Sequence, residues 1–233
     1  FESMSWIQFS GAGEDANKSD LATTFGWVGD DSTIAIQIKD CRAVKLRLFT
    51  IKAAADFPLQ TGINFHWSGV GTIGLRCTLR DIVVDGFDGY METGVLFDKD
   101  ASAADSNNSE HYLHNVRCRQ YGDYADSGFT DSAGFRNLQG QSKVHTFSSC
   151  EMNGSSRATR EGKYGYYGHG SFFWYNGQGG NHSATDGRDF YITGPNDTTI
   201  ISGHNSEGSD GFLETAGFSS APGPAMITGF RFA

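Results

Sequence analysis

No stretch of this 233-residue chain is apolar over the roughly 20 residues that a membrane-spanning helix requires. Positive charge is also in deficit, because 18 lysines and arginines stand against 27 acidic residues and leave a formal net charge of −9. Affinity for a nucleic-acid backbone comes from contacts between cations and phosphates, so this balance argues against nucleic acid and against an anionic membrane surface as partners. We therefore expect neither nucleic-acid binding nor membrane insertion.

Cysteine is scarce as well, and Cys41, Cys77, Cys118 and Cys150 do not have the spacing of a metal site. We expect them to be small buried hydrophobic residues, and we leave disulfides and the redox compartment open. The chain also lacks a Ser-His-Asp spacing, a nucleophile elbow, a phosphate-binding loop and a dinucleotide fingerprint. These absences exclude the corresponding enzyme classes as leading interpretations.

No segment keeps a 3.6-residue apolar period for three turns, which argues against helical repeats. What the chain has in quantity is glycine, with 31 residues, while charged residues make up only 19%. Serine, threonine and asparagine supply the remaining polarity. This composition favours strands and turns.

One pattern occurs three times at a constant interval, in Leu79–Asp85, Leu113–Arg119 and Phe147–Asn153. Apolar residues take the first, fourth and sixth positions, and a small polar residue takes the third. Repeats of roughly 20–45 residues are typical of stacked units that cannot bury a core alone. Each copy reads as a strand, a sharp turn at the third residue and a second strand, because Asn and Asp tolerate left-handed backbone.

Stacked copies would pair in parallel at about 4.7–4.9 Å and form a β-solenoid. A fourth copy is expected at 41–46, with Ala43 at the turn position. Long loops are expected at 98–110 and 121–142, and the aromatic segment 161–187 is expected to interrupt the regular windings. Repeats of this size give roughly six to nine windings, enough for one domain over residues 1–233.

The segment Ile7–Gly13, the Leu79 copy and the segment Ile201–Gly208 resemble the right-handed parallel β-helix of the pectin-lyase-like superfamily, with phage tailspikes and pectate-lyase-like proteins as the closest examples. The resemblance covers nearly the whole chain and implies an all-β fold, a single-stranded right-handed parallel β-helix with long loop insertions. It also implies an extracellular or virion location, a homotrimer or other virion proteins as partners, and a polysaccharide ligand.

In that superfamily a capping helix and a further strand precede the glycine-rich first turn, and neither is present here. The chain begins at Phe1 and ends at Ala233 within the repeat pattern. We therefore expect a fragment of a longer chain, with the N-terminal cap and a C-terminal part missing.

Outward positions of the repeat would place Arg117 beside Glu151 and Asp85 beside Arg119 on adjacent windings. A carboxylate acid/base with an arginine that recognises sugar acids is one interpretation, which makes these four residues the candidate catalytic set. The alternative is two exposed salt bridges between neighbouring strands, which are common on any sheet and contribute little stability.

Acidic residues also cluster at 81–92, at 123–131 and at Asp186 with Asp189. Glycosidases need two carboxyl groups at a defined separation, and lyases of this fold often use Ca²⁺ bound by aspartates. The alternative is that these side chains are turn residues or solvated. We expect no cofactor and assign no metal ligand, with Ca²⁺ as the one ion that the resemblance admits. The tripeptide 168–170 matches a Gly-His-Gly motif of polygalacturonases, but the companion motifs are missing.

The segment 163–182 is the candidate substrate-binding region, because tyrosine and tryptophan faces stack on sugar rings while amides and histidine orient them. The alternative is an insertion that packs on its own solenoid or on a neighbouring subunit. The candidate substrate-binding residues are Tyr164, Tyr166, Tyr167, His169, Trp174, Tyr175 and Asn176.

His111 and His145 share an offset from the repeat and are expected to stack on adjacent windings, as a structural pair rather than a metal site. Taken together, these patterns favour a virion-associated, tailspike-like protein that binds, and could depolymerise, a cell-surface or extracellular polysaccharide. The alternatives are a non-catalytic virion fibre, decoration protein or surface adhesin, and a secreted bacterial polysaccharide lyase.

Overall fold

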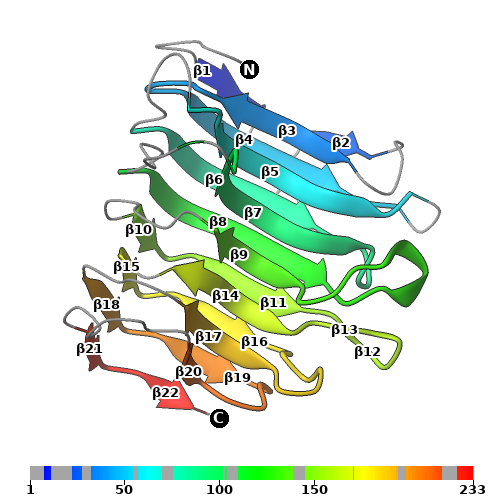
Figure 1. Ribbon diagram of the computed structural model, residues 1–233, viewed down its shortest axis with the longest axis vertical. Helices are drawn as coiled ribbons and strands as arrows, with labels where there is room; N and C mark the ends of the chain where they lie inside the picture. The colour runs from blue at the N-terminus through cyan, green and yellow to red at the C-terminus, as the bar shows by residue number, and fades with distance from the viewer. Residues whose placement is uncertain are drawn as a thin grey trace.

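The computed structural model describes residues 8–11, 23–27, 33–54, 57–69, 76–101, 103, 110–138, 145–169, 171–193, 198–216 and 225–232. Within these residues the chain is all-β, apart from one turn of 3₁₀ helix, η1 (Ala125–Ser127). The strands form two long parallel sheets whose windings follow one another from β1 at one end to β22 at the other (Figure 1). This arrangement is compatible with a β-solenoid.

The smaller sheet has seven strands in the described part of the chain: β3 (Ile34–Lys39), β5 (Leu59–Trp67), β7 (Met91–Lys99), β9 (Ala133–Asn137), β14 (Tyr164–His169), β17 (Arg188–Thr193) and β20 (Leu213–Ala216). The larger sheet has thirteen: β1 (Gln8–Ser10), β2 (Thr24–Gly26), β4 (Lys45–Lys52), β6 (Thr78–Asp85), β8 (Tyr112–Tyr121), β10 (His145–Ser148), β11 (Glu151–Gly154), β15 (Phe172–Tyr175), β16 (Gln178–Gly180), β18 (Thr199–Ser202), β19 (Asn205–Glu207), β21 (Ala225–Thr228) and β22 (Arg231–Phe232). A short antiparallel hairpin, β12 (Ser156–Arg157) and β13 (Arg160–Glu161), lies outside both sheets.

The three copies of the repeat lie directly above one another, as the sequence predicts. Leu79 is in register with Leu113, and Leu113 is in register with Phe147. The same column continues upward to Leu46 and downward to Trp174. All five side chains are buried, because residues at equivalent positions of parallel strands point to the same face and here that face is the interior.

The sharp turn at the third position is confirmed. Asp81, Asn115 and Ser149 have φ of 52°, 51° and 53°, in the left-handed region that short polar side chains tolerate. Each of these residues divides its winding into two strand segments that face different directions, so the interior is enclosed from more than one side.

Three predictions of the winding pattern are wrong. The fourth copy begins at Leu46, not at Cys41, and its turn residue is Leu48 with φ of 62°. Ala43 also has left-handed backbone, with φ of 56°, but it precedes this copy. The expected loop 121–142 contains β9, whose Phe135 is in the core. The aromatic segment 161–187 does not interrupt the windings, because β14, β15 and β16 pair with the strands of both neighbouring windings.

Candidate ligand-binding groove

The polar feature with the most regular construction is a groove over the second strand segment of four consecutive windings. It consists of two adjoining hollows of about 530 Å³ and 500 Å³, which share Glu151, Gln178 and Asn205. The remaining lining residues are mostly amides, charged side chains and glycines: Asn115, Arg117, Arg119, Ser149, Cys150, Met152, Asn153, Asn176, Gly177, Gly179, Gly180, Asn181, Gly203, Glu207 and Gly208.

Strand register brings these side chains together. Arg117, Glu151, Gln178 and Asn205 are successive partners in one outward column. A second outward column contains Arg119, Asn153, Gly180 and Glu207. Since side chains alternate between the two faces of a strand, the residues between these columns point inward and hold the groove on the core.

The predicted neighbours are in register, but the ion pair they form is a different one. Arg117 is the strand partner of Glu151, and Asp85 is the strand partner of Arg119. The salt bridge joins Arg119 to Glu151, with Nε donating to Oε1 at 2.9 Å and Nη2 donating to Oε2 at 2.8 Å. The pairing is diagonal along the sheet, and it has two hydrogen bonds because two parallel N–H groups of a guanidinium match the two oxygens of a carboxylate.

The other two members of the candidate catalytic set have different partners. Arg117 donates from Nε to Oδ1 of Asn115 at 3.1 Å. Asp85 accepts the backbone N–H of Phe87 at 2.8 Å and does not line either hollow. The structure therefore brings Arg117, Arg119 and Glu151 into one groove and leaves Asp85 outside it.

The lower part of the groove, over β16 and β19, contains side-chain donors and acceptors that form no hydrogen bonds with the described residues. No hydrogen bond or ion pair to the side chains of Gln178, Asn205 and Glu207 is present within the described ranges, and all three are at least partly exposed. Gly180 deepens this part, because a Cβ there would lie 2.4 Å from the carbonyl oxygen of Glu207. A ligand in the groove would therefore meet donors and acceptors that are open to it.

Sequence reasoning missed these lower residues because the windings become shorter after Phe147. The strand partner of Glu151 in the next winding is Gln178. Fewer residues separate these two than separate successive copies of the repeat. A shorter constant interval separates the core residues Phe147, Trp174 and Ile201, which are partners in one inward column. Counting this shorter interval onward from Glu151 along the chain leads to Gln178.

The aromatic residues of the predicted substrate-binding segment do not form one site. Trp174 and Tyr166 are fully buried in the core, so their rings cannot stack on a ligand at the surface. Tyr164 and Tyr167 cluster with Tyr191 at centroid distances of 5.0–5.5 Å on the outer face of the smaller sheet. Tyr175 is half-buried on the larger sheet, His169 is half-buried at the end of β14, and only Asn176 lines the groove.

Directly behind the groove lies a buried carboxylate that sequence reasoning counted only as one of several clustered acids. Both oxygens of Asp189 accept hydrogen bonds, Oδ1 from Nδ1 of His182 at 2.7 Å and Oδ2 from Nε2 of His204 at 2.9 Å. Ser209 adds a third at 2.6 Å. All three side chains of the Asp–His–His group are fully buried.

Proton positions in this cluster follow from its donors. The indole N–H of Trp174 can only donate, so Nδ1 of His204, 3.0 Å away, must accept and Nε2 carries the proton. At His182 the Tyr121 hydroxyl lies 2.6 Å from Nε2. Burial alone would raise the pKa of Asp189, but the hydrogen bonds from His182 and His204 outweigh it and hold that pKa well below its usual range.

The hydrogen bonds of this cluster connect neighbouring windings of the groove, because its two histidines flank two of the strands that form the groove. His182 follows β16 by two residues, and His204 immediately precedes β19. Tyr121 ends β8, the strand of Arg117 and Arg119. The carboxylate of Asp189 also lies beneath Gly179 of the groove, where a Cβ would approach it to 2.9 Å.

The predicted histidine stack is confirmed. The rings of His111 and His145 are nearly parallel with centroids 5.3 Å apart, and His145 also stacks on Phe97 at 4.4 Å. Neither nitrogen of His145 has a hydrogen-bond partner within the described structure. Burial lowers the pKa of His145 to about 3.

This burial predicts acid sensitivity. Below about pH 6.5 this histidine is protonated in the unfolded chain, whereas in the folded chain His145 stays neutral until pH approaches 3. The free energy of unfolding should therefore fall by about 1.4 kcal/mol per pH unit over this range. His145→Phe keeps the stack on Phe97 but removes the titrating group. Between pH 7 and pH 4.5 we expect its free energy of unfolding to fall by about 3 kcal/mol less than that of the unmodified chain. Urea unfolding at both pH values measures this difference, and equal losses would contradict the assignment.

Comparisons with known proteins do not assign the chain to a family. A scan against protein-family models and searches of curated proteins and of solved structures found no match. Among the described residues no group of three or more His, Cys, Asp or Glu side chains could hold a metal ion. The described part also has no helix long and apolar enough to span a membrane.

Proposed function

We propose that this chain is a single-stranded right-handed parallel β-helix of the pectin-lyase-like kind, and that it binds a polysaccharide in the groove centred on Glu151, Gln178 and Asn205. Two observations support the fold assignment, namely the stacked parallel windings and the left-handed corner residue in successive windings. The tailspike-like setting, in a virion or outside the cell, and threefold association stay predictions from the resemblance.

The observation that carries the binding proposal is the continuity of the polar groove across four windings. Three steps of about 4.8 Å give a track of roughly 14 Å along the stack, long enough for more than one sugar residue. Amide and charged side chains project into it at each winding, and sugars are bound through such precisely placed polar groups.

Binding is supported more directly than cleavage. Glu151, the predicted acid/base of the groove, is held by two hydrogen bonds from Arg119 and is only 7% exposed. A general base must come within hydrogen-bond reach of the proton that it removes. Depolymerisation through Glu151 would therefore require a substrate that reaches a largely buried carboxylate.

A matched pair of glutamine variants tests the site. We expect Gln178→Ala to weaken binding to an oligosaccharide identified on a glycan array by roughly 3–10-fold, the equivalent of one lost hydrogen bond. Gln37→Ala removes an amide that is also exposed, from β3 on the other sheet, and should leave the affinity unchanged. Isothermal titration calorimetry measures both.

Three results would count against the proposal. Equal affinities for the two variants would place the ligand elsewhere, and no binding on the array would favour a structural fibre, a decoration protein or an adhesin with a protein ligand. Release of new reducing ends or unsaturated sugars, abolished by Glu151→Gln, would show an enzyme instead of a binding protein.

A further inference from the structure

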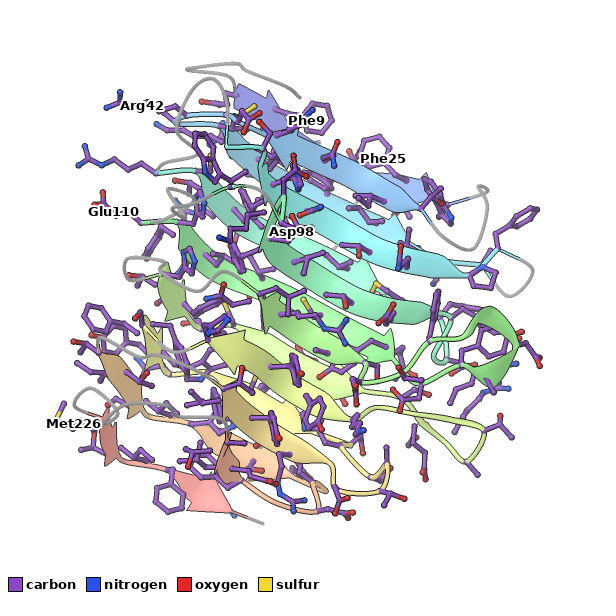
Figure 2. All side chains as sticks on the ribbon, in the orientation of Figure 1. Phe9, Phe25, Arg42, Asp98, Glu110 and Met226 are labelled. Atoms are coloured by element: carbon purple, nitrogen blue, oxygen red, sulfur yellow. The ribbon has the colours of Figure 1, made fainter. Side chains whose placement is uncertain are left out.

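The outer face of β4 and β6 carries positive charge, although the whole chain has a formal net charge of −9. Five exposed cations lie on these two strands or just before them, and we call them the basic patch: Arg42, Lys45, Arg47, Arg76 and Arg80. Among the described residues two carboxylates pair with the patch, Asp81 with Arg80 at 3.1 Å and Glu110 with Arg76 at 2.8 Å. Figure 2 shows Arg42 and Glu110 projecting from the same side of the stack. Five cations less two carboxylates leave a local excess of positive charge.

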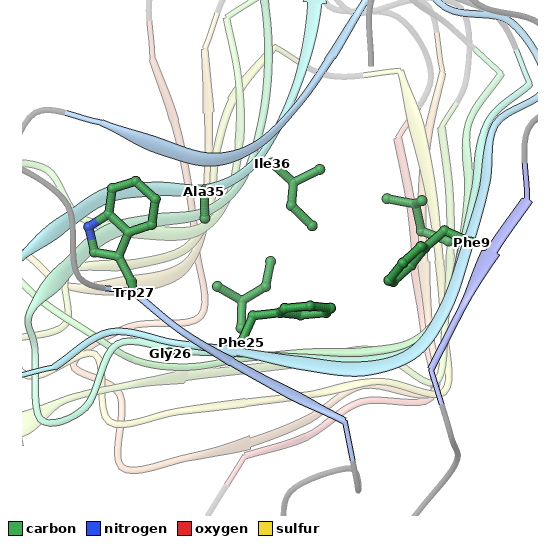
Figure 3. A pocket seen from close by; sticks show the side chains of 8 residues that line it. Phe9, Phe25, Gly26, Trp27, Ala35 and Ile36 are labelled. Carbon is green, nitrogen blue, oxygen red and sulfur yellow. The ribbon is translucent and has the colours of Figure 1, made fainter.

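Alternation along β4 puts the cations outside and an apolar residue inside. Lys45 and Arg47 flank Leu46, and successive side chains of a strand point to opposite faces. Leu46 lines an apolar pocket of about 280 Å³, and Figure 3 shows Phe9 and Phe25 pointing into it. The interior of these windings is therefore apolar, and the cations face the solvent.

Strand register places like charges beside one another in the basic patch. Arg47 is the strand partner of Arg80, and neighbouring strands lie about 4.8 Å apart. Arg47 donates from Nε to the hydroxyl of Ser10 at 3.2 Å, and within the described ranges it has no carboxylate partner; nor do Arg42 and Lys45. Like charges on neighbouring strands repel each other, and an anionic ligand would remove that repulsion.

The next winding adds aromatic rings to the same two outward columns. Tyr112 lies two strands below Lys45, and His114 lies directly below Arg80. The rings of Tyr112 and His114 are nearly parallel with centroids 6.2 Å apart, and Tyr112 is 42% exposed. Aromatic faces stack on sugar rings, and guanidinium groups bind carboxylates and phosphates through paired N–H donors. A polymer with both sugar rings and negative charges would match both parts of this surface.

We propose that the basic patch and Tyr112 together bind an anionic polysaccharide. This surface is separate from the groove, because none of its residues lines either hollow, so the proposal does not depend on what the groove binds. A single polymer chain can follow a patch that is only two windings wide. A nucleic acid or a lipid bilayer would bring a broader negative surface against an otherwise acidic protein.

Isothermal titration calorimetry with dextran sulfate, hyaluronate and uncharged dextran tests the proposal. The two anionic polymers should bind and dextran should not. Binding should weaken from about 50 mM to about 300 mM salt, because interactions between exposed charges are screened over this range. The tighter of the two anionic polymers identifies sulfate or carboxylate as the group that the patch prefers.

Arg47→Glu distinguishes a site on the patch from general attraction to the protein. It should weaken dextran sulfate binding by at least about 10-fold, the equivalent of one lost hydrogen bond between charged groups. The new carboxylate would lie beside Arg80 and attract it, so the variant should keep the stability of the unmodified chain. Arg157→Glu is the matched control, because it changes the net charge equally at a side chain that is 58% exposed on the hairpin outside both sheets. The control should change the affinity by less than about 2-fold.

Tyr112→Ala tests the contact with the sugar rings. It should weaken dextran sulfate binding by about 3–10-fold and leave the affinity for inorganic polyphosphate, which has charges but no sugar rings, unchanged. Gln178→Ala, which alters the groove, should leave dextran sulfate binding unchanged. Failure of the groove as a binding site and failure of the patch are therefore distinguishable.

Three outcomes would overturn the proposal. The first is that dextran sulfate and hyaluronate bind no more tightly than dextran. The second is an equal loss of affinity in Arg47→Glu and Arg157→Glu, which would show attraction by the whole protein and not by the patch. The third is tighter binding to duplex DNA or to vesicles of anionic lipid than to either polysaccharide, which would indicate a different class of partner.

Discussion

Trp174→Ala should lower the free energy of unfolding by about 3–5 kcal/mol, because it empties the largest fully buried side chain of the core. The indole ring lies 5.5 Å from the rings of both Phe147 and Phe190, and its N–H donates to His204. Phe147 is held in the paired strand β10 and Phe190 in β17 of the smaller sheet, so neither ring can move into the space and most of the cavity would remain. Chemical denaturation followed by circular dichroism measures the loss.

Phe173→Ala is the matched control, because Phe173 is the preceding aromatic residue but points outward and is half-buried. Phe173→Ala should lower the free energy of unfolding by no more than about 1 kcal/mol. If Trp174→Ala were as mild as Phe173→Ala and instead reduced glycan binding, the ring would be a ligand contact, as the sequence predicts, and its burial in the core would be wrong.

Asp189→Asn should lower the free energy of unfolding by about 3–5 kcal/mol at neutral pH. An amide in place of the carboxylate turns one acceptor into a donor, so either His182 or His204 would face an N–H group in a site without solvent. Equilibrium unfolding in urea measures the change. Asp186→Asn is the control, since Asp186 lies exposed at a turn with φ of 62°, a conformation that asparagine adopts readily.

The same variant has a pH signature. The folded-state pKa of Asp189 is depressed, so its contribution to stability is present above the unfolded-state pKa of about 3.9 and is lost as pH falls further. The difference between the unmodified chain and Asp189→Asn should therefore be constant from pH 7 to about pH 5 and shrink below about pH 4. A difference that stays constant down to about pH 3 would show that the carboxylate is not the source of the effect.

Much of the architecture could be predicted because it is encoded locally. Alternating apolar residues, a short polar residue at the third position and a fixed spacing were sufficient to place Leu79, Leu113 and Phe147 in one column. The left-handed corners at Asp81 and Asn115 follow from the backbone preferences of those two residue types alone. The same register correctly put Arg117 beside Glu151.

The groove was only partly predictable. Its upper half lies in the longer windings, where the interval between the repeat copies is regular and Arg117, Arg119 and Glu151 could be assigned to it. Its lower half lies in the shorter windings that follow, so Gln178 and Asn205 were missed. The same shortening led to Trp174 being predicted as a surface residue, although it continues the column of Phe147.

By itself the sequence determined the corners and the stacking of the three windings that contain Leu79, Leu113 and Phe147, because each copy of the repeat depends on residues close together in the chain. Tertiary structure alone decided which polar groups meet. Strand register puts Arg117 beside Glu151, but in the folded structure Arg119 forms the ion pair with Glu151 and Arg117 donates to Asn115. Asp189 accepts hydrogen bonds from His182 and His204 because the fold brings these three side chains, which come from different segments of the chain, into one site without solvent.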